Sequence, residues 1–258
     1  MFSGFTDETI RFLLDLKFHN NSEFFHANHD RYIDVVQTPF YEFIGDLAPD
    51  MQKIDPRMEV RPYKCLSRIH RDTRFSRDKS PYRDHHWLLF RRAAEPREQS
   101  VNYFFEFGPD RLNWGLGVWG ENRELFDLFR RRMRSNPDGT QAMLDDMNLG
   151  RRHLVLTGSA YKRMEIPPEI PDRLRMWYSV REMYICKYEP DYQSAFSDRV
   201  LKDVRNDFIA MAPMYHLLRG YADEMEKPER NEENGLADAE KWIGCARDGC
   251  RRRGCPDR

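Results

Sequence analysis

The sequence lacks a long apolar run, an excess of charge of one sign and a secretory signal. No stretch of about 18 or more apolar residues occurs, so we expect no membrane-spanning helix. Arg and Lys number 42 and Asp and Glu 43, so the formal net charge is -1. This near balance disfavours a surface coated with positive charge for nucleic acid, and any basic site must be local. The N-terminal stretch MFSGFTDETIRF turns acidic and amphipathic at once, which argues against a leader peptide.

Cysteine is also scarce, with five residues in 258. Cys65 and Cys186 are isolated, and Cys245, Cys250 and Cys255 recur every five residues near the C-terminus. An odd number without C-x-x-C pairs predicts neither a disulfide framework nor a four-ligand zinc site. We therefore expect free thiols, no bound metal, no cofactor and a cytoplasmic protein.

The common catalytic motifs HExxH, GxSxG and GxxxxGK[ST] are absent, as is the glycine fingerprint of dinucleotide-binding proteins. Three histidines do lie close in sequence to three aspartates: His70, His85 and His86 with Asp72, Asp78 and Asp84. Acid–base or metal chemistry therefore stays open. On a strand, the side chains of His85 and His86 would point to opposite faces, which argues against a shared metal. The sequence leaves open whether the protein is an enzyme.

The first third of the chain is dominated by helical patterns. The sequence predicts a helix over residues 6–18 with Thr6 as N-cap, and a second cap at Asn20. A helical stripe of apolar residues continues to Leu47, with a kink or two abutting helices at Pro39. Three prolines indicate a connecting loop over residues 49–66, which ends in a short strand near residues 64–69.

The middle of the chain carries strand patterns instead. Residues 86–90 form a short apolar run, and alternation over 101–107 and 112–118 around a Gly-Pro-Asp turn predicts an antiparallel hairpin. Gly115 and Gly117 share one face of this hairpin, so another backbone or a ligand can approach it closely. Further strands are expected at 153–156 and 180–186.

Helices return after Gly120, with a new start at Asn136-Pro137, and again from Ser197 with a restart at Pro213. The aromatic residues, 17 Phe, 12 Tyr and 5 Trp, suffice for a packed core. We predict one α+β domain over residues 1–225, with a mainly antiparallel sheet packed against N- and C-terminal helices. Residues 226–258 are charged and contain few core residues, which is typical of a flexible tail. The sequence sets no oligomeric state.

Residues 68–82, RIHRDTRFSRDKSPY, carry an arginine at every third position from Arg68 to Arg77, with aspartates between them. Over residues 68–92, eight Arg and Lys residues face three Asp, which leaves five positive charges uncompensated. The guanidinium group offers five donors in a planar fork that suits carboxylate or phosphate. This stretch therefore indicates either a site for a small anion or an ionic network that stabilises a loop.

The same stretch carries the pattern R-x-x-R-D-x-R-F-x-x-D-K-x-x-Y. Its residues are Arg68, Arg71, Asp72, Arg74, Phe75, Asp78, Lys79 and Tyr82. The pattern resembles the signature of an uncharacterised bacterial and fungal family, classed as a domain of unknown function. The resemblance covers roughly residues 5–222 and implies family membership, but no reaction.

Two interpretations of this stretch remain open. In the first, Arg68, Arg71, Arg74 and Lys79 converge on a phosphorylated or carboxylated metabolite, and Tyr82 adds a hydroxyl group. In the second, the network is purely structural. We assign Asp72, Phe75 and Asp78 to the architecture of the loop: the two aspartates pair with arginines, and Phe75 anchors the loop. Arg77 lies outside the pattern, and we expect it to face solvent.

An alternative to a protein that binds a small anion is a module that binds nucleic acid. Arg91, Arg92 and the clusters at 130–134 and 251–253 could contact phosphates, with Trp87 or Phe90 available for stacking. Basic residues near the end of a helix also suit its dipole without any ligand. Together with the net charge, this makes nucleic acid the less favoured partner.

Overall fold

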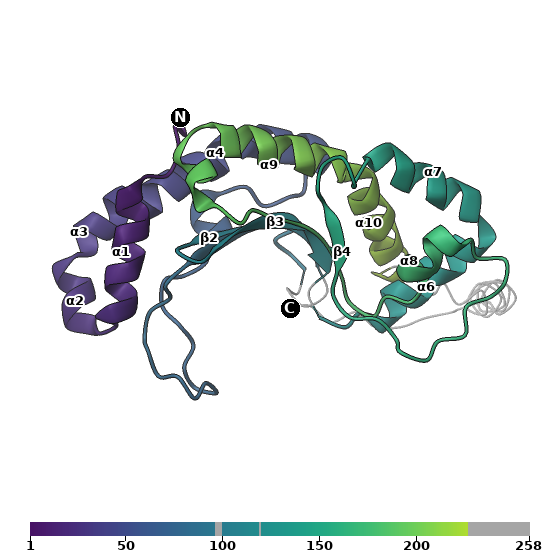
Figure 1. Cartoon of the computed structure of the whole chain (residues 1–258), viewed down its shortest axis with the longest axis horizontal. Coiled ribbons are helices and arrows are strands. Elements are labelled where there is room, and N and C mark those ends of the chain that lie inside the picture. Colours follow the sequence, from purple (N-terminus) through teal and green to yellow (C-terminus); the bar gives the residue numbers. More distant parts are fainter. Residues whose placement is uncertain (96–99, 119, 227–258) are drawn as a thin grey trace, which may run out of the picture. The chain divides into compact units, whose positions relative to one another are not determined.

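The computed structural model describes residues 1–95, 100–118 and 120–226. The chain divides into two compact units, Met1–Ala222 and Asp223–Arg258. The first unit is an α+β domain, which confirms the predicted fold class (Figure 1). Of the second unit, only the end of the last helix lies among the described residues. The predicted tail, its three cysteines and the cluster at 251–253 lie outside them.

The sheet has five strands in the order β1-β2-β3-β5-β4, and all neighbours are antiparallel. The strands are β1 (His86–Phe90), β2 (Val101–Gly108), β3 (Arg111–Val118), β4 (Val155–Thr157) and β5 (Met183–Tyr188). The predicted strand at 86–90 and the hairpin at 101–118 are confirmed. The predicted strands at 153–156 and 180–186 lie two to three residues too early, because Val180 forms only an isolated bridge with Ala160.

Helices precede and follow the sheet. The N-terminal helices are α1 (Asp7–Phe18), α2 (Ser22–Ala27), α3 (His29–Tyr32), α4 (Thr38–Ile54) and α5 (Pro62–Cys65). After β3 come α6 (Arg123–Ser135), α7 (Pro137–Met147), α8 (Arg175–Tyr178), α9 (Arg199–Ala210) and α10 (Ala212–Glu226). The turns η3 (Asp172–Leu174) and η4 (Tyr192–Phe196) are 3-10 helices. The restart expected at Pro213 is confirmed by the boundary between α9 and α10.

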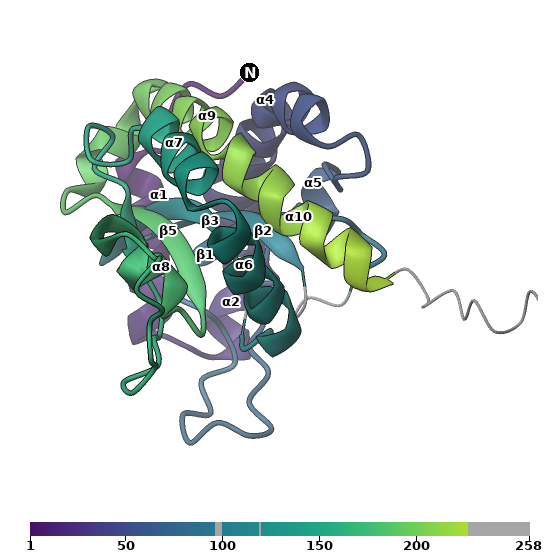
Figure 2. The same ribbon diagram turned by 90° about the vertical axis from the view of Figure 1, so that its right-hand side faces the viewer.

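The helices cover one face of the sheet, which we call the core face. In Figure 1, α4 and α9 run along this face. The ring of Phe5 stacks on that of Phe107 with centroids 4.4 Å apart, and Phe43 lies 4.6 Å from Phe105. Figure 2 shows α10 beside α6, where the rings of Phe129 and Tyr221 are 6.4 Å apart. The core therefore lies between these helices and the sheet.

Of the two alternatives predicted at Pro39, the structure has abutting helices: the π-helical turn η1 (Ile33–Gln37) follows α3 directly and ends where α4 begins, at Thr38. Pro39 lies in the first turn of α4, where a missing N–H is tolerated. In a regular helix its N–H would have bonded to the carbonyl of Val35. The buried hydroxyl of Thr9 donates to that carbonyl at 2.6 Å. Thr9 on α1 thus stabilises the irregular turn.

Three other local predictions were wrong. Pro49 lies inside α4 and not in a loop, since α4 continues to Ile54. Residues 64–69 form the end of α5 and an isolated bridge from Leu66 to Leu88 in place of a strand. The second cap is Asn21, whose Oδ1 accepts from the Phe24 N–H at 2.9 Å. Asn20 makes a long-range contact that local sequence does not reveal.

A buried ionic network joins α4, the end of β1 and α10. Asp55 follows α4, and its carboxylate accepts hydrogen bonds from Arg92 Nε at 2.6 Å and from the Tyr215 hydroxyl at 2.7 Å. Asp55 and Arg92 are both buried. Burial raises the pKa of Asp55, but the hydrogen bonds from Tyr215, the Arg57 backbone and Arg92 outweigh it, and the pKa is lowered.

We predict that Asp55→Ala lowers the free energy of unfolding by about 3–5 kcal/mol, because Arg92 loses its closest buried partner. The exposed Asp146 on α7 provides a control, and Asp146→Ala should change stability by less than about 0.5 kcal/mol. Urea denaturation of the three proteins measures both values. Equal losses in the two variants would contradict the assigned role of Asp55.

Candidate functional site: a basic pocket at the sheet edge

Residues 68–82, the arginine loop, leave and rejoin the domain beside the edge strand β1 (Figure 1). The base of the loop is an irregular antiparallel ladder. The Arg83 N–H donates to the Ile69 carbonyl at 2.9 Å, and the Arg71 N–H donates to the Pro81 carbonyl at 2.8 Å. Ile69 and Tyr82 are buried below this ladder, and they anchor the loop to the domain.

Asn20 clamps the returning strand of the loop. Its Nδ2 donates to the Tyr82 carbonyl at 3.0 Å, and its Oδ1 accepts from the Tyr82 N–H at 2.9 Å. The ring of Tyr82 stacks on Phe25 of α2 with centroids 4.4 Å apart. The N-terminal helices thereby position the arginine loop relative to the sheet.

The tip of the loop holds itself together with short-range polar contacts. The Arg74 guanidinium donates to both oxygens of Asp72, at 3.0 and 2.7 Å, and hydrogen bonds from Arg74 lower the pKa of Asp72 to about 2. Asp78 accepts hydrogen bonds from the hydroxyl and the N–H of Ser80 and pairs with Arg71. These contacts lower the pKa of Asp78 as well. Each of the two aspartates therefore pairs with an arginine of the same loop.

Phe75 does not anchor the loop, because its side chain is 93% exposed. Its ring contacts only the guanidinium of Arg74, whose carbon lies 5.8 Å from the ring centroid, among the described residues. Ile69 and Tyr82 at the base supply the apolar attachment that was expected from Phe75. Arg77 is exposed, as predicted.

A cavity of about 560 Å³ lies between the arginine loop, α5 and β1, and we call it the basic pocket. Six cationic side chains and one carboxylate, that of Asp72, are among the residues that line it. The six are Lys64, Arg68, Arg71, Arg74, Arg83 and Arg91. So many like charges around one cavity create a strongly positive potential, which favours an anion in it.

These cations differ in how they are held. Arg68 is exposed and forms no hydrogen bond or ion pair with any other described residue. The guanidinium carbon of Arg83 lies 4.3 Å from the ring centroid of Trp87, and Arg91 donates to the carbonyls of Arg92 and Glu95. Arg83 and Arg91 are therefore fixed in the wall, whereas Arg68 is available to a ligand.

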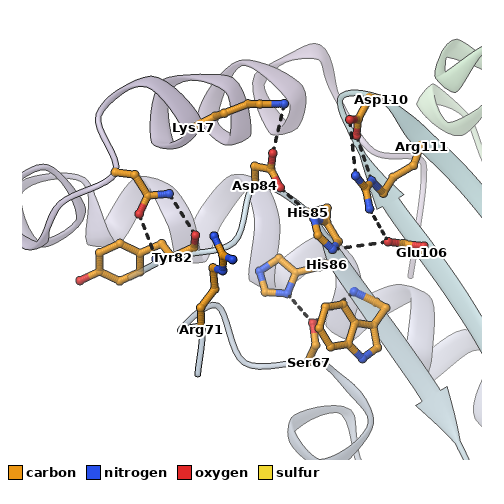
Figure 3. A network of polar contacts seen from close by, with 12 residues as sticks. Lys17, Ser67, Arg71, Tyr82, Asp84, His85, His86, Glu106, Asp110 and Arg111 are labelled. Carbon is orange, nitrogen blue, oxygen red and sulfur yellow. Dashed lines mark hydrogen bonds and ion pairs between the residues drawn. The ribbon is translucent and has the colours of Figure 1, made fainter. Parts of the chain in front are cut away.

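The structure brings together three of the five residues predicted to bind an anion, namely Arg68, Arg71 and Arg74. Lys79 instead donates to the Thr73 carbonyl at 2.8 Å and does not line the basic pocket. The hydroxyl of Tyr82 points away from Arg71 (Figure 3). Both residues support the loop.

Sequence reasoning did not assign Lys64, Arg83 and Arg91 to the site for a small anion, and named Arg91 only as a contact to nucleic-acid phosphates. Arg83 and Arg91 contributed to the excess of positive charge over residues 68–92, so the signal for them was present. Lys64 lies on α5, and only the folding of α5 against β1 brings it to the pocket.

A chain of charged residues continues from the pocket along the sheet edge (Figure 3). Lys17 pairs with Asp84 at 3.2 Å, and Asp84 contacts His85 Nδ1 at 2.8 Å. His85 Nε2 lies 3.4 Å from Glu106, which accepts from Arg111 at 3.1 Å. Burial raises the pKa of Asp84, but the hydrogen bonds from His85 and Lys17 outweigh it and lower the pKa. The contacts with Asp84 and Glu106 hold the His85 ring in place beside the start of β1.

His86 points to the core face and is fully buried. The Trp87 N–H donates to Ser67 Oγ at 3.1 Å, and Ser67 Oγ also hydrogen-bonds to His86 Nδ1 at 3.1 Å. His86 Nε2 lies 3.4 Å from the Tyr32 hydroxyl. Burial lowers the pKa of His86 to about 3. A general base needs a pKa near the working pH, so the lowered pKa disfavours this role for His86, and its contact with Ser67 links the pocket wall to the core.

His85 and His86 point to opposite faces of the sheet, as expected for neighbours on a strand. Among residues 1–95, 100–118 and 120–226, no group of three or more His, Cys, Asp or Glu side chains is placed to hold a metal ion. Over the same residues, no helix is both long and apolar enough to cross a membrane.

The fold and the basic pocket define an α+β protein with a cationic cavity beside the edge strand of its sheet. The profile of the conserved hypothetical protein family DUF2461 matches residues 8–217. The chain therefore belongs to this family, and the membership inferred from residues 68–82 is confirmed. A search of curated proteins finds no match to the chain.

We predict that stability falls on acidification through His86. Between pH about 6.5 and about 3 the unfolded chain binds a proton on this histidine, whereas the folded protein does not. The free energy of unfolding should therefore decrease by up to about 1.4 kcal/mol per pH unit from this residue. Urea denaturation from pH 7 to pH 5 measures the slope.

His86→Gln should remove this contribution and flatten the slope, even if the variant is less stable throughout. His26→Gln, at an exposed position on α2, should keep the slope of the natural protein. An unchanged slope in His86→Gln would show that His86 is not the residue responsible.

Proposed function

We propose that the protein binds a small phosphorylated or carboxylated molecule in the basic pocket. The observation that carries this proposal is the imbalance of charge in the lining, where six cations face one carboxylate. The volume of about 560 Å³ lies in the range of small-molecule sites. The proposal concerns binding, and whether a reaction follows is a separate question.

The acids of the arginine loop do not cancel this potential. Asp72 and Asp78 are exposed, so water screens their ion pairs with Arg74 and Arg71 and weakens them. A ligand phosphate or carboxylate can accept two parallel hydrogen bonds from a guanidinium group, which is a stronger contact. Arg71 and Arg74 can therefore exchange or share their partners when an anion enters.

A purely structural network accounts less well for Arg68. Arg71 and Arg74 each have an acidic partner within the loop, but Arg68 contacts no acid among the described residues. An arginine that lines a cavity without a partner contributes little to folding. Binding an anion gives it a role.

Nucleic acid receives less support as a partner. Arg130 is buried and donates to the Val180 carbonyl at 2.8 Å, and Arg134 pairs with Glu169 at 2.8 Å. Phe90 is buried, and the guanidinium of Arg83 lies over the ring of Trp87. Most of the described residues that could contact phosphates or stack on bases therefore already contact other residues of the domain.

Isothermal titration with inorganic phosphate and with acetate tests the proposal. We predict that Arg68→Ala weakens phosphate binding by about tenfold, the loss of one charge-assisted hydrogen bond. The free energy of unfolding should stay within about 0.5 kcal/mol of the natural value, because Arg68 has no described partner to lose.

Arg77 provides the matched control, since it is an exposed arginine of the same loop that does not line the pocket. Arg77→Ala should bind phosphate as the natural protein does. Absence of binding to either anion, or equal losses in both variants, would contradict the proposed site.

A further inference from the structure

A second cavity, of about 280 Å³, lies on the face of the sheet opposite the core, and we call it the sheet-face pocket. Its apolar lining comes from Trp87 and Leu89 on β1, Phe104 on β2 and Tyr184 on β5. Leu89 lies directly opposite Phe104 in the register of β1 and β2. The pocket is thus made by side chains that strand alternation turns away from the helices.

A glycine of β3 lets one aromatic wall of this pocket lie against the sheet. Gly115 lies opposite Phe104, and Gly117 lies opposite Tyr184. A Cβ atom added to Gly117 would be 2.3 Å from Cδ1 of the Tyr184 ring, so the ring rests on the bare backbone. The rings of Phe104 and Tyr184 meet edge to face with centroids 6.2 Å apart. A flat group placed there would contact aromatic walls.

Hydrogen-bond acceptors complete the lining. Asn102 donates through Nδ2 to the Ser100 carbonyl at 3.2 Å, and its Oδ1 accepts no hydrogen bond from another described residue. The Glu106 carboxylate accepts from Arg111 and Asn113, each at 3.1 Å, and keeps further lone pairs. A ring that carries N–H or O–H groups would find acceptors here.

The sheet-face pocket borders the basic pocket, since Trp87 and Leu89 line both. The face of Trp87 also carries the guanidinium of Arg83, at 4.3 Å. This adjacency favours a molecule that places a charged group among the arginines and a ring against the aromatic walls. His85 and Glu106 also line the sheet-face pocket, and Figure 3 shows them in contact with each other.

We infer that the ligand is an anion with a flat aromatic or heteroaromatic ring. Its phosphate or carboxylate binds in the basic pocket, and its ring binds in the sheet-face pocket. The inference rests on the proposed function, because the charged group provides the anchor. Under this inference, aryl and heteroaryl phosphates and carboxylates are the preferred class of ligand. Anions without a ring should bind more weakly.

Titration of the full chain with phenyl phosphate and with inorganic phosphate tests this inference. The natural protein should bind phenyl phosphate at least about fivefold more tightly, the value of one aromatic contact. Phe104→Ala should abolish this advantage and leave the affinity for inorganic phosphate within about twofold. Phe104→Leu keeps most of the side-chain volume and should also abolish the preference for phenyl phosphate. Because this variant preserves the packing, a loss of preference in it reports the loss of stacking and not misfolding.

Tyr188 supplies the control, because it is an exposed tyrosine at the end of β5 that does not line the pocket. Tyr188→Ala should retain the preference for phenyl phosphate. Equal affinities for the two phosphates in the natural protein, or a preference that persists in both Phe104 variants, would overturn the inference but leave anion binding intact. If neither phosphate bound, the proposed function itself would fail.

Discussion

Two hydrogen bonds between the Asn20 side chain and the backbone of Tyr82 determine how the arginine loop leaves the sheet. They connect residues 62 positions apart in sequence, and the Phe25–Tyr82 stacking reinforces them. Without this clamp, the loop base would depend on a few ladder hydrogen bonds beside an edge strand. The basic pocket is therefore a product of tertiary contacts from the N-terminal helices and not of the loop alone.

The charges of this domain fall into two groups with different physical roles. Asp55 and Arg92 are buried and hydrogen-bonded, so each becomes costly when the other is removed. Asp72 and Arg74 face water, so their attraction is screened and their geometry can change at little cost. The same residue types thus provide rigidity inside the domain and adaptability at the pocket.

Much of the fold could be predicted from local patterns, since alternation over residues 101–118 and a turn at 108–110 leave one reasonable hairpin. Features that depend on distant partners could not. Pro49 is accommodated inside α4, and Asn20 bonds to Tyr82 in place of capping α2. The pattern of residues 68–82 pointed to the loop that lines the basic pocket. It could not distinguish Arg68, which lines the pocket without a described partner, from Lys79, which bonds to the loop backbone. Lys64 lines the basic pocket only because α5 packs against β1, which the local sequence does not reveal.

The π-helical turn at Ile33–Gln37 has a consequence for insertions and deletions. A π-helical turn holds one residue more than an α-helical turn, so removing one residue here would leave a regular helix with α3 and α4 in nearly the same phase. Removing a second residue would rotate α3 by about 100° relative to α4. Phe40 and Phe43 would then keep their places against the sheet, while Phe25 would turn away from Tyr82. The spacing between Phe25 and Phe40 thus positions the arginine loop without involving any residue of that loop, and the π-helical turn tolerates the loss of one residue but not of two.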